Sequence, residues 1–540
     1  MKKRLFPFLL ALLALLPLFA AWQPVDAPRN VIIMIPDGAG DALFTLARWH
    51  VNEPLAVDAM PAGRVRTYAS NNLVTDSTAA ATAMSSGVKT HNNAINIGPR
   101  ENFYRVADAP EVPAGQPVAT LFEAAKRAGL ATGIVTTDTL TGATPAAFGG
   151  CHTMSRKSHD VIARQLTAQQ PDVLLGGGML MFQSEARGGM RGDGLDLDLA
   201  WAAAGGAFVT NRAQLAAHTA GRVMGVFAPW TMTPAMDRAA FAPHEPSLPE
   251  MTHHALRLLE KNKNGFFLMV EGGRPDHAAH VNDTAMAVTE LVEFDKAVAV
   301  ALQFARRDRR TLLIVAADHE TGGLTIGNHE AGGVHFENLI LPLKRMRVSS
   351  ERLVKIIGEE PTAADIAMRT QIHWGVRLTD DDAQGVLDAV PTSPFGLASA
   401  LVSYVNRKSL KVGWTTHHHT GGDVTLYAYG PCAPSGLLDN TDIARVAAAA
   451  MRADLDALGA SLFVDSRELF PDAVLMPAEK PDHLLLADGS RIFFDDSARV
   501  YPNGARRPLG GLAVHVPETR MCYLPAESKR ASASKSSVAK

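Results

Sequence analysis

The sequence predicts an α/β protein with a doubly wound, mainly parallel central sheet flanked by helices. Short apolar runs rich in β-branched residues recur along the first 320 residues, and most end at an acidic residue or a glycine cluster. Such runs are typical of strands buried on both faces, as in parallel sheets. Helical stretches, such as residues 118–128 and 285–306, separate them. Strands that alternate with helices indicate a doubly wound architecture.

The N-terminus has the features of a secretory signal. Lys2-Lys3-Arg4 precedes an apolar stretch over residues 5–19, which is too short to favour a membrane span. We expect residues 1–21 to be a signal peptide, which directs the protein to the periplasm or outside the cell. No stable membrane insertion is expected after its removal, and an uncleaved anchor is the alternative.

The composition is that of a globular protein with a large core. Of the 540 residues, 47% are hydrophobic and 20% are charged, which argues against a disordered chain. The formal net charge of −3 argues against nucleic acid as a partner, because such binding depends on clustered basic residues. Three cysteines are too few for a disulfide scaffold. If one pair forms after export, we expect Cys432 with Cys522.

Five apolar runs end in residues that can carry chemistry. Ligands bind outside the carboxyl ends of the strands in doubly wound sheets, so these endings are expected to meet at one edge. A single acidic residue there is usually a helix cap or turn residue, but Asp37, Glu271 and Asp318 together would repel one another without a shared cation. The endings are Asp37 after residues 31–35, Asp138 after 133–135, glycines 176–178 after 173–175, Glu271 after 266–270 and Asp318-His319 after 312–316.

Histidines occur at metal-ligand spacing near two of these endings. In Asp276-His277-Ala278-Ala279-His280, the first and last residues lie one helical turn apart and can bind one ion, whereas His277 points elsewhere. Asp318-His319 and His417-His418-His419 offer further ligands. Each cluster alone is as well explained by a surface helix pair or a polar loop, but together they predict a multi-metal site. Carboxylates and imidazoles suit zinc, and magnesium where oxygen ligands predominate.

A serine opens an alanine-rich, helix-forming stretch in Thr75-Asp76-Ser77-Thr78-Ala79. At a helix N-terminus, backbone N–H groups and the helix dipole favour negative charge, so a Ser77 hydroxyl there is placed to attack phosphorus. Metal ions beside it would ease loss of its proton. The alternative is that Asp76 and Ser77 only cap the helix.

In their order along the chain, these motifs resemble those of the alkaline phosphatase family over residues 30–431. Any one match could arise by chance, whereas the ordered set is specific. The resembling segments are Pro36-Asp37-Gly38, Thr75-Asp76-Ser77-Thr78-Ala79, Ala143-Thr144-Pro145-Ala146-Ala147, Val270-Glu271-Gly272-Gly273-Arg274, Asp276-His277-Ala278-Ala279-His280, Ala317-Asp318-His319 and His419-Thr420-Gly421.

The resemblance implies a role for each matched residue. Ser77 would be the nucleophile that becomes phosphoserine, and Arg156 would clamp two non-bridging phosphate oxygens; otherwise Arg156 is a surface cation. Two zinc ions and one magnesium ion are implied as cofactors. Their implied ligands are Asp276, His280 and His419 for the first zinc, Asp37, Asp318 and His319 for the second, beside Ser77, and Asp37, Thr144 and Glu271 for magnesium.

The chain departs from the family pattern near the magnesium ligands. Gly142 stands two residues before Thr144, where relatives carry Asp or His, and water is expected to fill that place. Ala235 stands where animal relatives have a carboxylate, so no calcium site is expected. His419 is preferred over His418 because Thr420-Gly421 follows it. Supporting roles are expected of three other residues, His277 near the phosphate and, as structural residues, Asp76 and Lys89.

The sequence therefore predicts an exported, metal-dependent phosphomonoesterase that acts on small phosphate monoesters through a phosphoserine, with a homodimer as one possible assembly. A phosphodiesterase on the same fold and a non-catalytic exported phosphate- or metal-binding protein are the alternatives. Arg156 favours monoesters, because their phosphate presents two free oxygens to it. The predicted segments are 1–21 (signal peptide), 22–320 (core), 321–414 (accessory, crown-like insertion), 415–460 (return to the core), 461–525 (β-rich addition) and 526–540 (disordered tail).

Overall fold

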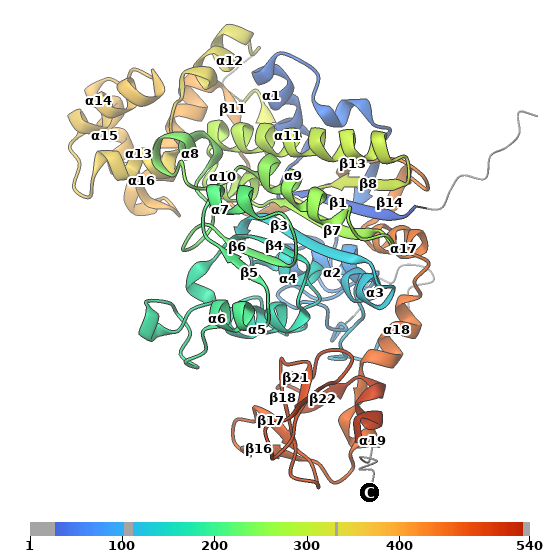
Figure 1. Cartoon of the computed structure of the whole chain (residues 1–540). Helices are drawn as coiled ribbons and strands as arrows, with labels where there is room; N and C mark the ends of the chain where they lie inside the picture. The colour runs from blue at the N-terminus through green and yellow to red at the C-terminus, as the bar shows by residue number, and fades with distance from the viewer. Residues whose placement is uncertain (1–27, 102–111, 330–332, 533–540) are drawn as a thin grey trace, which may run out of the picture.

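The computed structural model contains a ten-stranded sheet with helices on both faces (Figure 1). It describes residues 28–101, 112–329 and 333–532, so the predicted signal peptide lies outside the described residues. The strands of this sheet are β1 (Asn30–Pro36), β2 (Ala62–Arg66), β3 (Ala131–Thr139), β4 (Val173–Gly177), β5 (Ala207–Val209), β6 (Val223–Val226), β7 (Phe266–Gly272), β8 (Thr311–Ala316), β13 (Val424–Tyr429) and β14 (Gly436–Asp439).

The strand order confirms the predicted doubly wound, mainly parallel sheet. It runs β14-β2-β13-β8-β1-β7-β3-β4-β6-β5. β1 lies between β7 and β8 and is parallel to both, with Ile35 opposite Glu271 and Met34 opposite Val315. The exception is β13, which is antiparallel to β2 and β8. Because β1, β7 and β8 are parallel and in register, their carboxyl ends lie at one edge of the sheet.

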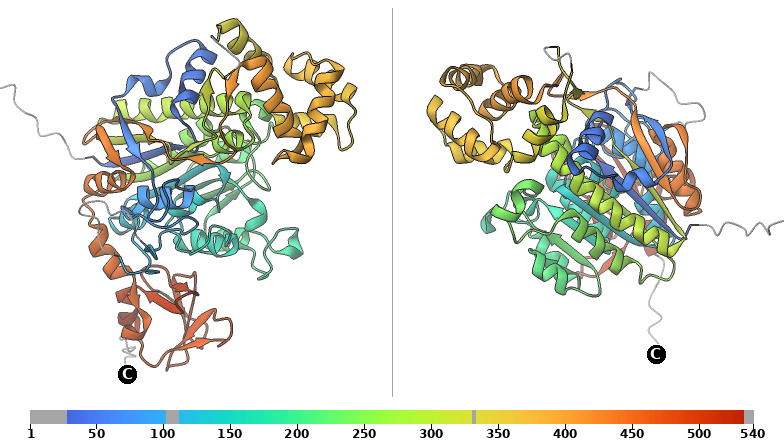
Figure 2. Two further views of the ribbon diagram at one scale, coloured as in Figure 1. Left: turned by 180° about the vertical axis from the view of Figure 1, so that it is seen from behind. Right: turned by 90° about the horizontal axis from the view of Figure 1, so that it is seen from above.

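Helices cover both faces of the sheet (Figures 1 and 2). All residues of β1 and β8 are buried beneath them, as the apolar runs predict. The expected helices over 118–128 and 285–306 are present as α3 (Leu121–Arg127) and α11 (Thr284–Asp308). One face carries α1 (Asp41–Val51), α9 (Leu248–Leu259) and α11 (Thr284–Asp308), and the other α2 (Ser77–Ser86), α3 (Leu121–Arg127), α4 (Ala143–Phe148) and α17 (Asn440–Ala450).

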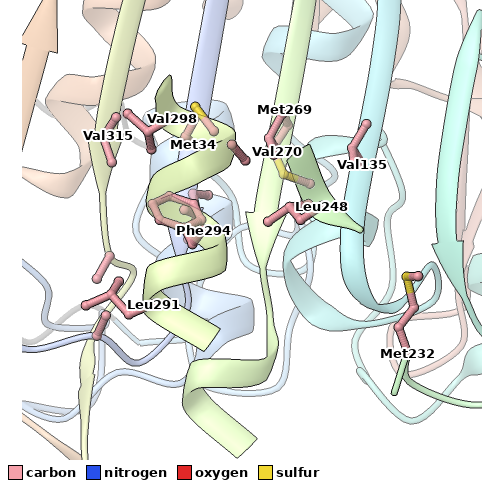
Figure 3. Packing of buried hydrophobic residues seen from close by; sticks show 14 of the residues in the cluster. Met34, Val135, Met232, Leu248, Met269, Val270, Leu291, Phe294, Val298 and Val315 are labelled. Carbon is pink, nitrogen blue, oxygen red and sulfur yellow. The ribbon is translucent and has the colours of Figure 1, made fainter. Parts of the chain in front are cut away.

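Helix α11 closes the core over the central strands (Figure 3). Its Leu291, Phe294 and Val298 are fully buried against side chains such as Met34 of β1 and Val315 of β8. Full burial of a side chain of this size contributes about 2 kcal/mol. This packing fixes the strands, and with them the residues that follow their ends.

The segment between residues 321 and 414 forms a helical lobe beside the sheet (Figure 1). The expected helices over 351–357 and 363–370 are present as α13 (Ser350–Ile357) and α14 (Ala363–Trp374). Two short antiparallel ribbons join the two ends of the segment, β9 (Glu320–Thr321) with β12 (His419–Thr420) and β10 (Thr325–Ile326) with β11 (Val412–Gly413). The helices are α12 (Phe336–Arg345), α13 (Ser350–Ile357), α14 (Ala363–Trp374), α15 (Asp380–Ala389) and α16 (Gly396–Val405).

Two small antiparallel sheets follow α18 (Leu455–Leu462) and form the lowest part of the molecule in Figure 1. They contact the core through α5 (His159–Gln169), where Gln165 Nε2 donates to Asp495 Oδ1 at 2.7 Å and an Arg164 guanidinium N–H donates to the Phe494 carbonyl at 2.9 Å. Their strands are β15 (Val464–Asp465), β21 (Val514–Val516) and β22 (Met521–Leu524), and β16 (Val474–Met476), β17 (His483–Leu485), β18 (Arg491–Phe493), β19 (Ala498–Val500) and β20 (Arg506–Pro508).

The structure corrects two sequence predictions. The tail predicted to be disordered from residue 526 begins with a 3-10 helix, Ala526–Ser532, in which the buried Ser528 donates its N–H to the Pro525 carbonyl. The predicted pairing of Cys432 with Cys522 is wrong, and all three cysteines are free. Cys432 is exposed in the turn after β13, whereas Cys522 is buried on β22 of the C-terminal addition.

Among the described helices, none combines the length and apolar character that crossing a membrane requires.

Candidate metal centre and active site

Three buried carboxylates meet at the carboxyl edge of the sheet, as their strand-end positions predict. Asp37 follows β1, Glu271 is the penultimate residue of β7 and Asp318 follows β8. The Asp37 N–H donates to the Gly272 carbonyl at 3.0 Å, and the Gly38 N–H donates to Asp318 Oδ1 at 3.2 Å. These backbone contacts fix the carboxylates relative to one another.

Gly38 allows the next helix to approach this edge. Its φ is +72°, in the region that favours glycine, and a Cβ there would lie 2.8 Å from the Cα of Asp276. Asp276 belongs to α10 (Arg274–Val281), which starts directly after β7. The glycine therefore lets the first turn of α10 pack against the end of β1, where it brings Asp276 to the carboxylates.

Asp276, His280 and His419 form one candidate ligand group. His280 Nε2 lies 3.2 Å from Asp276 Oδ2, and His419 Nε2 lies 3.3 Å from His280 Nε2. The two residues of α10 are one turn apart, whereas His419 reaches them through the pairing of β12 with β9. His418, the alternative considered from the sequence, is exposed.

The hydrogen bonds of these histidines aim their Nε2 atoms into the site. His280 Nδ1 donates to the His417 carbonyl at 2.7 Å, and His419 Nδ1 donates to the Thr75 carbonyl at 2.9 Å. A neutral imidazole that donates through Nδ1 keeps a lone pair on Nε2, which is the form that binds a metal. Both rings are therefore oriented as ligands.

A second group surrounds His319. Its Nε2 lies 3.1 Å from Asp318 Oδ2 and 3.8 Å from Asp37 Oδ1. Asp276 also offers an oxygen within 4.8 Å of ligand atoms of Asp37 and His319. Asp276 thus lies between the two groups, so two cations bound there would be close neighbours.

Several oxygen atoms in the site lack a hydrogen-bonding partner among the described residues. They are Asp37 Oδ1, Asp318 Oδ2 and Thr144 Oγ1, all buried. A buried polar atom left unpaired costs about 1–3 kcal/mol. A cation would serve as the missing partner, so this donor set fits divalent metal ions.

The pKa values of Asp37, Glu271 and Asp318 are raised by burial first and by neighbouring negative charge second. Burial, followed by the charges of Asp318 and Asp276, raises the pKa of Asp37 well above its ordinary value. Burial and then the Asp138 charge raise the pKa of Glu271 to about 8. Burial and the Asp276 charge raise the pKa of Asp318 to about 6. Positive charge at this edge would stabilise the ionised carboxylates.

Ser77 is the first residue of α2 and faces this second group. Its side chain is buried, and its Oγ lies 3.2 Å from His319 Nε2. The capping role considered for Ser77 belongs to Asp76, whose side chain accepts from the Ala79 N–H at 2.9 Å. The Ser77 hydroxyl is therefore available for chemistry at a helix N-terminus.

Of the remaining predicted residues, Arg156 and Thr144 lie near this serine and the carboxylates, whereas Lys89 follows the opposite end of α2. Arg156 is partly exposed, and its guanidinium lies 3.9 Å from Asp76 Oδ2, next to Ser77 along the chain. Thr144 is buried in the first turn of α4. Lys89 binds Asp439 at 3.1 Å and Asn440 at 2.6 Å, in keeping with the structural role expected of it.

Three further residues, Thr321, Thr136 and Asp138, contact the site without having been assigned a role in it. Thr321 Oγ1 donates to Asp276 Oδ1 at 2.5 Å, and the Thr136 hydroxyl donates to Glu271. Asp138 stands beside Gly142, where water was expected: a Cβ at position 142 would lie 2.6 Å from Asp138 Oδ2. The strand-end position of Asp138 was the signal that could have identified it.

Comparisons with known proteins agree with this geometry. The family model described as alkaline phosphatase matches residues 28–453. Alkaline phosphatase 3 of Bacillus subtilis is 36% identical over 441 residues, which cover 78% of this chain and 88% of that protein. Alkaline phosphatase of Escherichia coli is 30% identical over 477 residues, covering 77% and 85%. The crystal structure of Thermus thermophilus alkaline phosphatase superposes with a TM-score of 0.70 at 31% identity, covering 82% of this chain and 96% of that one.

Proposed function

The chain belongs to the alkaline phosphatase family, and on that basis we propose that Ser77 is the nucleophile of its reaction. The family relationship identifies the chain as a phosphate monoester hydrolase. The observation that supports Ser77 is its place, with Oγ 3.2 Å from His319 Nε2 at the N-terminus of α2. The site residues and the individual metal ions named below are parts of the same proposal.

Two zinc ions and one magnesium ion are the proposed cofactors. Cations held at this edge would supply the positive charge that lowers the pKa of the serine hydroxyl and stabilises charge on the phosphoryl oxygens. The proposed ligands are Asp276, His280 and His419 for one zinc, Asp37, Asp318 and His319 for the other, and Asp37, Thr144 and Glu271 for magnesium.

The reaction proceeds in two displacements. Ser77 Oγ forms a bond to phosphorus while the bond from phosphorus to the ester oxygen breaks, and the alcohol leaves. The N–H groups at the start of α2 favour the negative charge around the phosphoryl group. Arg156 donates to two non-bridging oxygens and holds the group in line. A water molecule then attacks the phosphoserine, which releases inorganic phosphate and restores the Ser77 hydroxyl.

Export belongs to this proposal as well. The basic Lys2-Lys3-Arg4 and the apolar residues 5–19 support a signal peptide, and we place the mature enzyme in the periplasm or outside the cell. N-terminal sequencing of the protein recovered from the extracellular or periplasmic fraction tests this. A mature chain that starts soon after residue 21 is the expected result, and retention of residues 1–21 would contradict it.

The choice between monoesters and diesters is tested by comparing turnover of an aryl phosphate with that of a bis-aryl phosphate. A phosphate monoester has three non-bridging oxygens and a diester has two, so with one oxygen turned toward the cation sites the monoester would leave two for Arg156 and the diester only one. We expect the monoester to be hydrolysed faster. Faster hydrolysis of the diester would favour a phosphodiesterase, and the absence of turnover with either would favour a non-catalytic binding protein.

A further inference from the structure

We propose that Asp138 supplies a carboxylate to the third cation site and takes over the place that Gly142 leaves without a side chain. The third site is the one assigned above to Asp37, Thr144 and Glu271, so this inference rests on the proposed function. The carboxylate would reach the site from the end of β3 instead of from the start of α4. The magnesium site would then receive this carboxylate from position 138, four residues before position 142.

The space beside Gly142 is occupied by Asp138. Gly142 is the N-cap residue of α4, with Thr144 in the first turn of that helix. A Cβ at position 142 would lie 2.6 Å from Asp138 Oδ2 and 3.0 Å from the Thr139 carbonyl oxygen. Real Cβ contacts are not this short, so any larger residue at 142 would displace the Asp138 carboxylate. Gly142 and Asp138 are therefore alternatives for one space, and this chain places its carboxylate there from position 138.

The neighbouring chain brings Asp138 close to Glu271 as well. A Cβ at Gly273, two residues after Glu271, would lie 2.8 Å from the Cβ of Asp138. Thr136 of β3 lies opposite Glu271 of β7, so Asp138 stands two residues past that pair at the same edge of the sheet. Acidic side chains gathered at one edge of a sheet repel each other unless a cation lies near them. Asp138 therefore faces the same region as the proposed magnesium ligands.

One oxygen of Asp138 remains available for a cation. Oδ1 accepts from the Thr139 N–H at 2.6 Å and lies 3.9 Å from His277 Nε2. Oδ2 accepts no hydrogen bond from the residues that the structure describes, and it is the atom that faces Gly142. One oxygen of the carboxylate is thus fixed by a hydrogen bond, and the other is available to bind a cation.

A chain of contacts positions His277 beside this carboxylate. An Arg274 guanidinium nitrogen lies 3.0 Å from His277 Nδ1, and the same guanidinium binds both oxygens of Glu351, at 2.8 and 2.9 Å. Because the guanidinium can only donate, His277 Nδ1 accepts, and the proton of the neutral ring lies on Nε2, toward Asp138. Glu351 comes from α13, so the helical lobe helps to orient the residues around the third site.

The test is to move the carboxylate. In Asp138→Asn the side chain keeps its size and loses its charge. In the double variant Asp138→Ala/Gly142→Asp the carboxylate is returned to the same space from position 142, where no clash with Asp138 remains. Magnesium affinity is measured by calorimetric titration of Mg²⁺ into protein whose zinc sites are filled, and bound zinc and magnesium are counted by elemental analysis. Asp381→Asn, an exposed carboxylate on α15, is the matched control.

We expect Asp138→Asn to raise the magnesium Kd about 10- to 100-fold, the range found for residues that support a metal site, while bound zinc stays unchanged. The double variant should recover most of the affinity, and Asp381→Asn should bind as the unaltered chain does. A magnesium Kd for Asp138→Asn within about twofold of the unaltered chain would overturn the proposal, as would equal loss of zinc and magnesium. Should the double variant fail to fold, Asp138→Asn still decides.

The outcomes also separate this inference from the proposed function. An unaltered protein that binds cations but does not hydrolyse an aryl phosphate would contradict the proposed function alone. An active unaltered protein whose Asp138→Asn variant keeps its magnesium affinity would contradict only the role of Asp138.

Discussion

Ser77 Oγ and His319 Nε2 lie 3.2 Å apart, although the two residues belong to α2 and to the loop after β8. A third group lies next to this pair, because His319 Nε2 is also 3.1 Å from Asp318 Oδ2. A serine hydroxyl, an imidazole nitrogen and a carboxylate oxygen thus share one small volume. That arrangement joins the predicted nucleophile to the predicted metal ligands.

Ser77→Ala should lower kcat on an aryl phosphate by at least about 1,000-fold, because it removes the atom that bonds to phosphorus. Bound zinc should stay unchanged, since the carboxylate and imidazole ligands remain. Acid-quenched enzyme should carry covalent phosphate in the unaltered chain and none in the variant. Ser86→Ala, at the other end of the same helix, is the control and should keep kcat within a few-fold of normal. Full activity of Ser77→Ala would refute the assigned mechanism.

Removal of metal by a chelator should abolish activity. The buried Asp37 and Asp318 oxygens would then lack their partner, so the thermal midpoint should fall as well. Zinc added together with magnesium should restore both properties, whereas magnesium alone should not restore activity. Rates and thermal midpoints before and after dialysis are the measurement. Indifference of the rate to the chelator would count decisively against the site.

Arg156→Ala should weaken catalysis of monoesters more than that of diesters. The guanidinium donates to two oxygens at once, and with one further oxygen facing the cation sites only a monoester has enough non-bridging oxygens for both contacts. We expect kcat/KM for an aryl phosphate to fall about 10- to 1,000-fold, and the affinity for inorganic phosphate to fall with it. Lys157→Ala changes the adjacent, exposed cation and is the control. An equal loss on monoester and diester would show that Arg156 does not distinguish them.

Asp495→Asn should stabilise the junction between the core and the C-terminal addition at alkaline pH. Burial raises the pKa of Asp495 to about 6, in spite of the hydrogen bond from Gln165. The folded state therefore favours the protonated form, and its stability falls as the pH rises through that pKa. Asparagine stays neutral, can still accept from Gln165 and tolerates the φ of +60° at this position.

The expected gain for Asp495→Asn is about 3 kcal/mol at pH 8 and about half of that at pH 5, from the shift in pKa between the folded and unfolded states. Urea unfolding of the variant and the unaltered chain at both pH values measures it. Asp496→Asn, next in the chain and paired with Arg506, should show no such gain. A pH-independent difference between Asp495→Asn and the unaltered chain would contradict the assigned charge effect.

The central strands and their acidic endings could be predicted because the information is local. Residues 31–35, 266–270 and 312–316 are apolar at every position, which is the pattern of a strand buried on both faces, and Asp37, Glu271 and Asp318 follow from it. The antiparallel β13 escaped prediction, since the direction of a short strand depends on the neighbours it meets and not on its own residues.

The long-range contacts of the site were harder to predict. His419 depends on the pairing of β12 with β9 across the helical lobe, so the residue pattern offered it only as one of three adjacent histidines and the family resemblance selected it. Arg274 and Glu351 are two charges among many, and their pairing is set by the docking of α13. For Asp138, the turn between β3 and α4 decides whether a carboxylate reaches the site from position 138 or 142, and one sequence does not determine the shape of that turn.

The helical lobe leaves the sheet at Thr321 and returns at His419, and these two residues are paired partners. The lobe is thus a long loop whose two ends are held together by strand pairing, outside its helices. The entropic cost of closing such a loop grows only slowly with the number of residues in it. Helices could therefore be gained or lost there over evolutionary time while His419 keeps its distance from Asp276 and His280. The ribbon of β9 and β12 therefore holds His419 in place whatever the length of the lobe between the two strands.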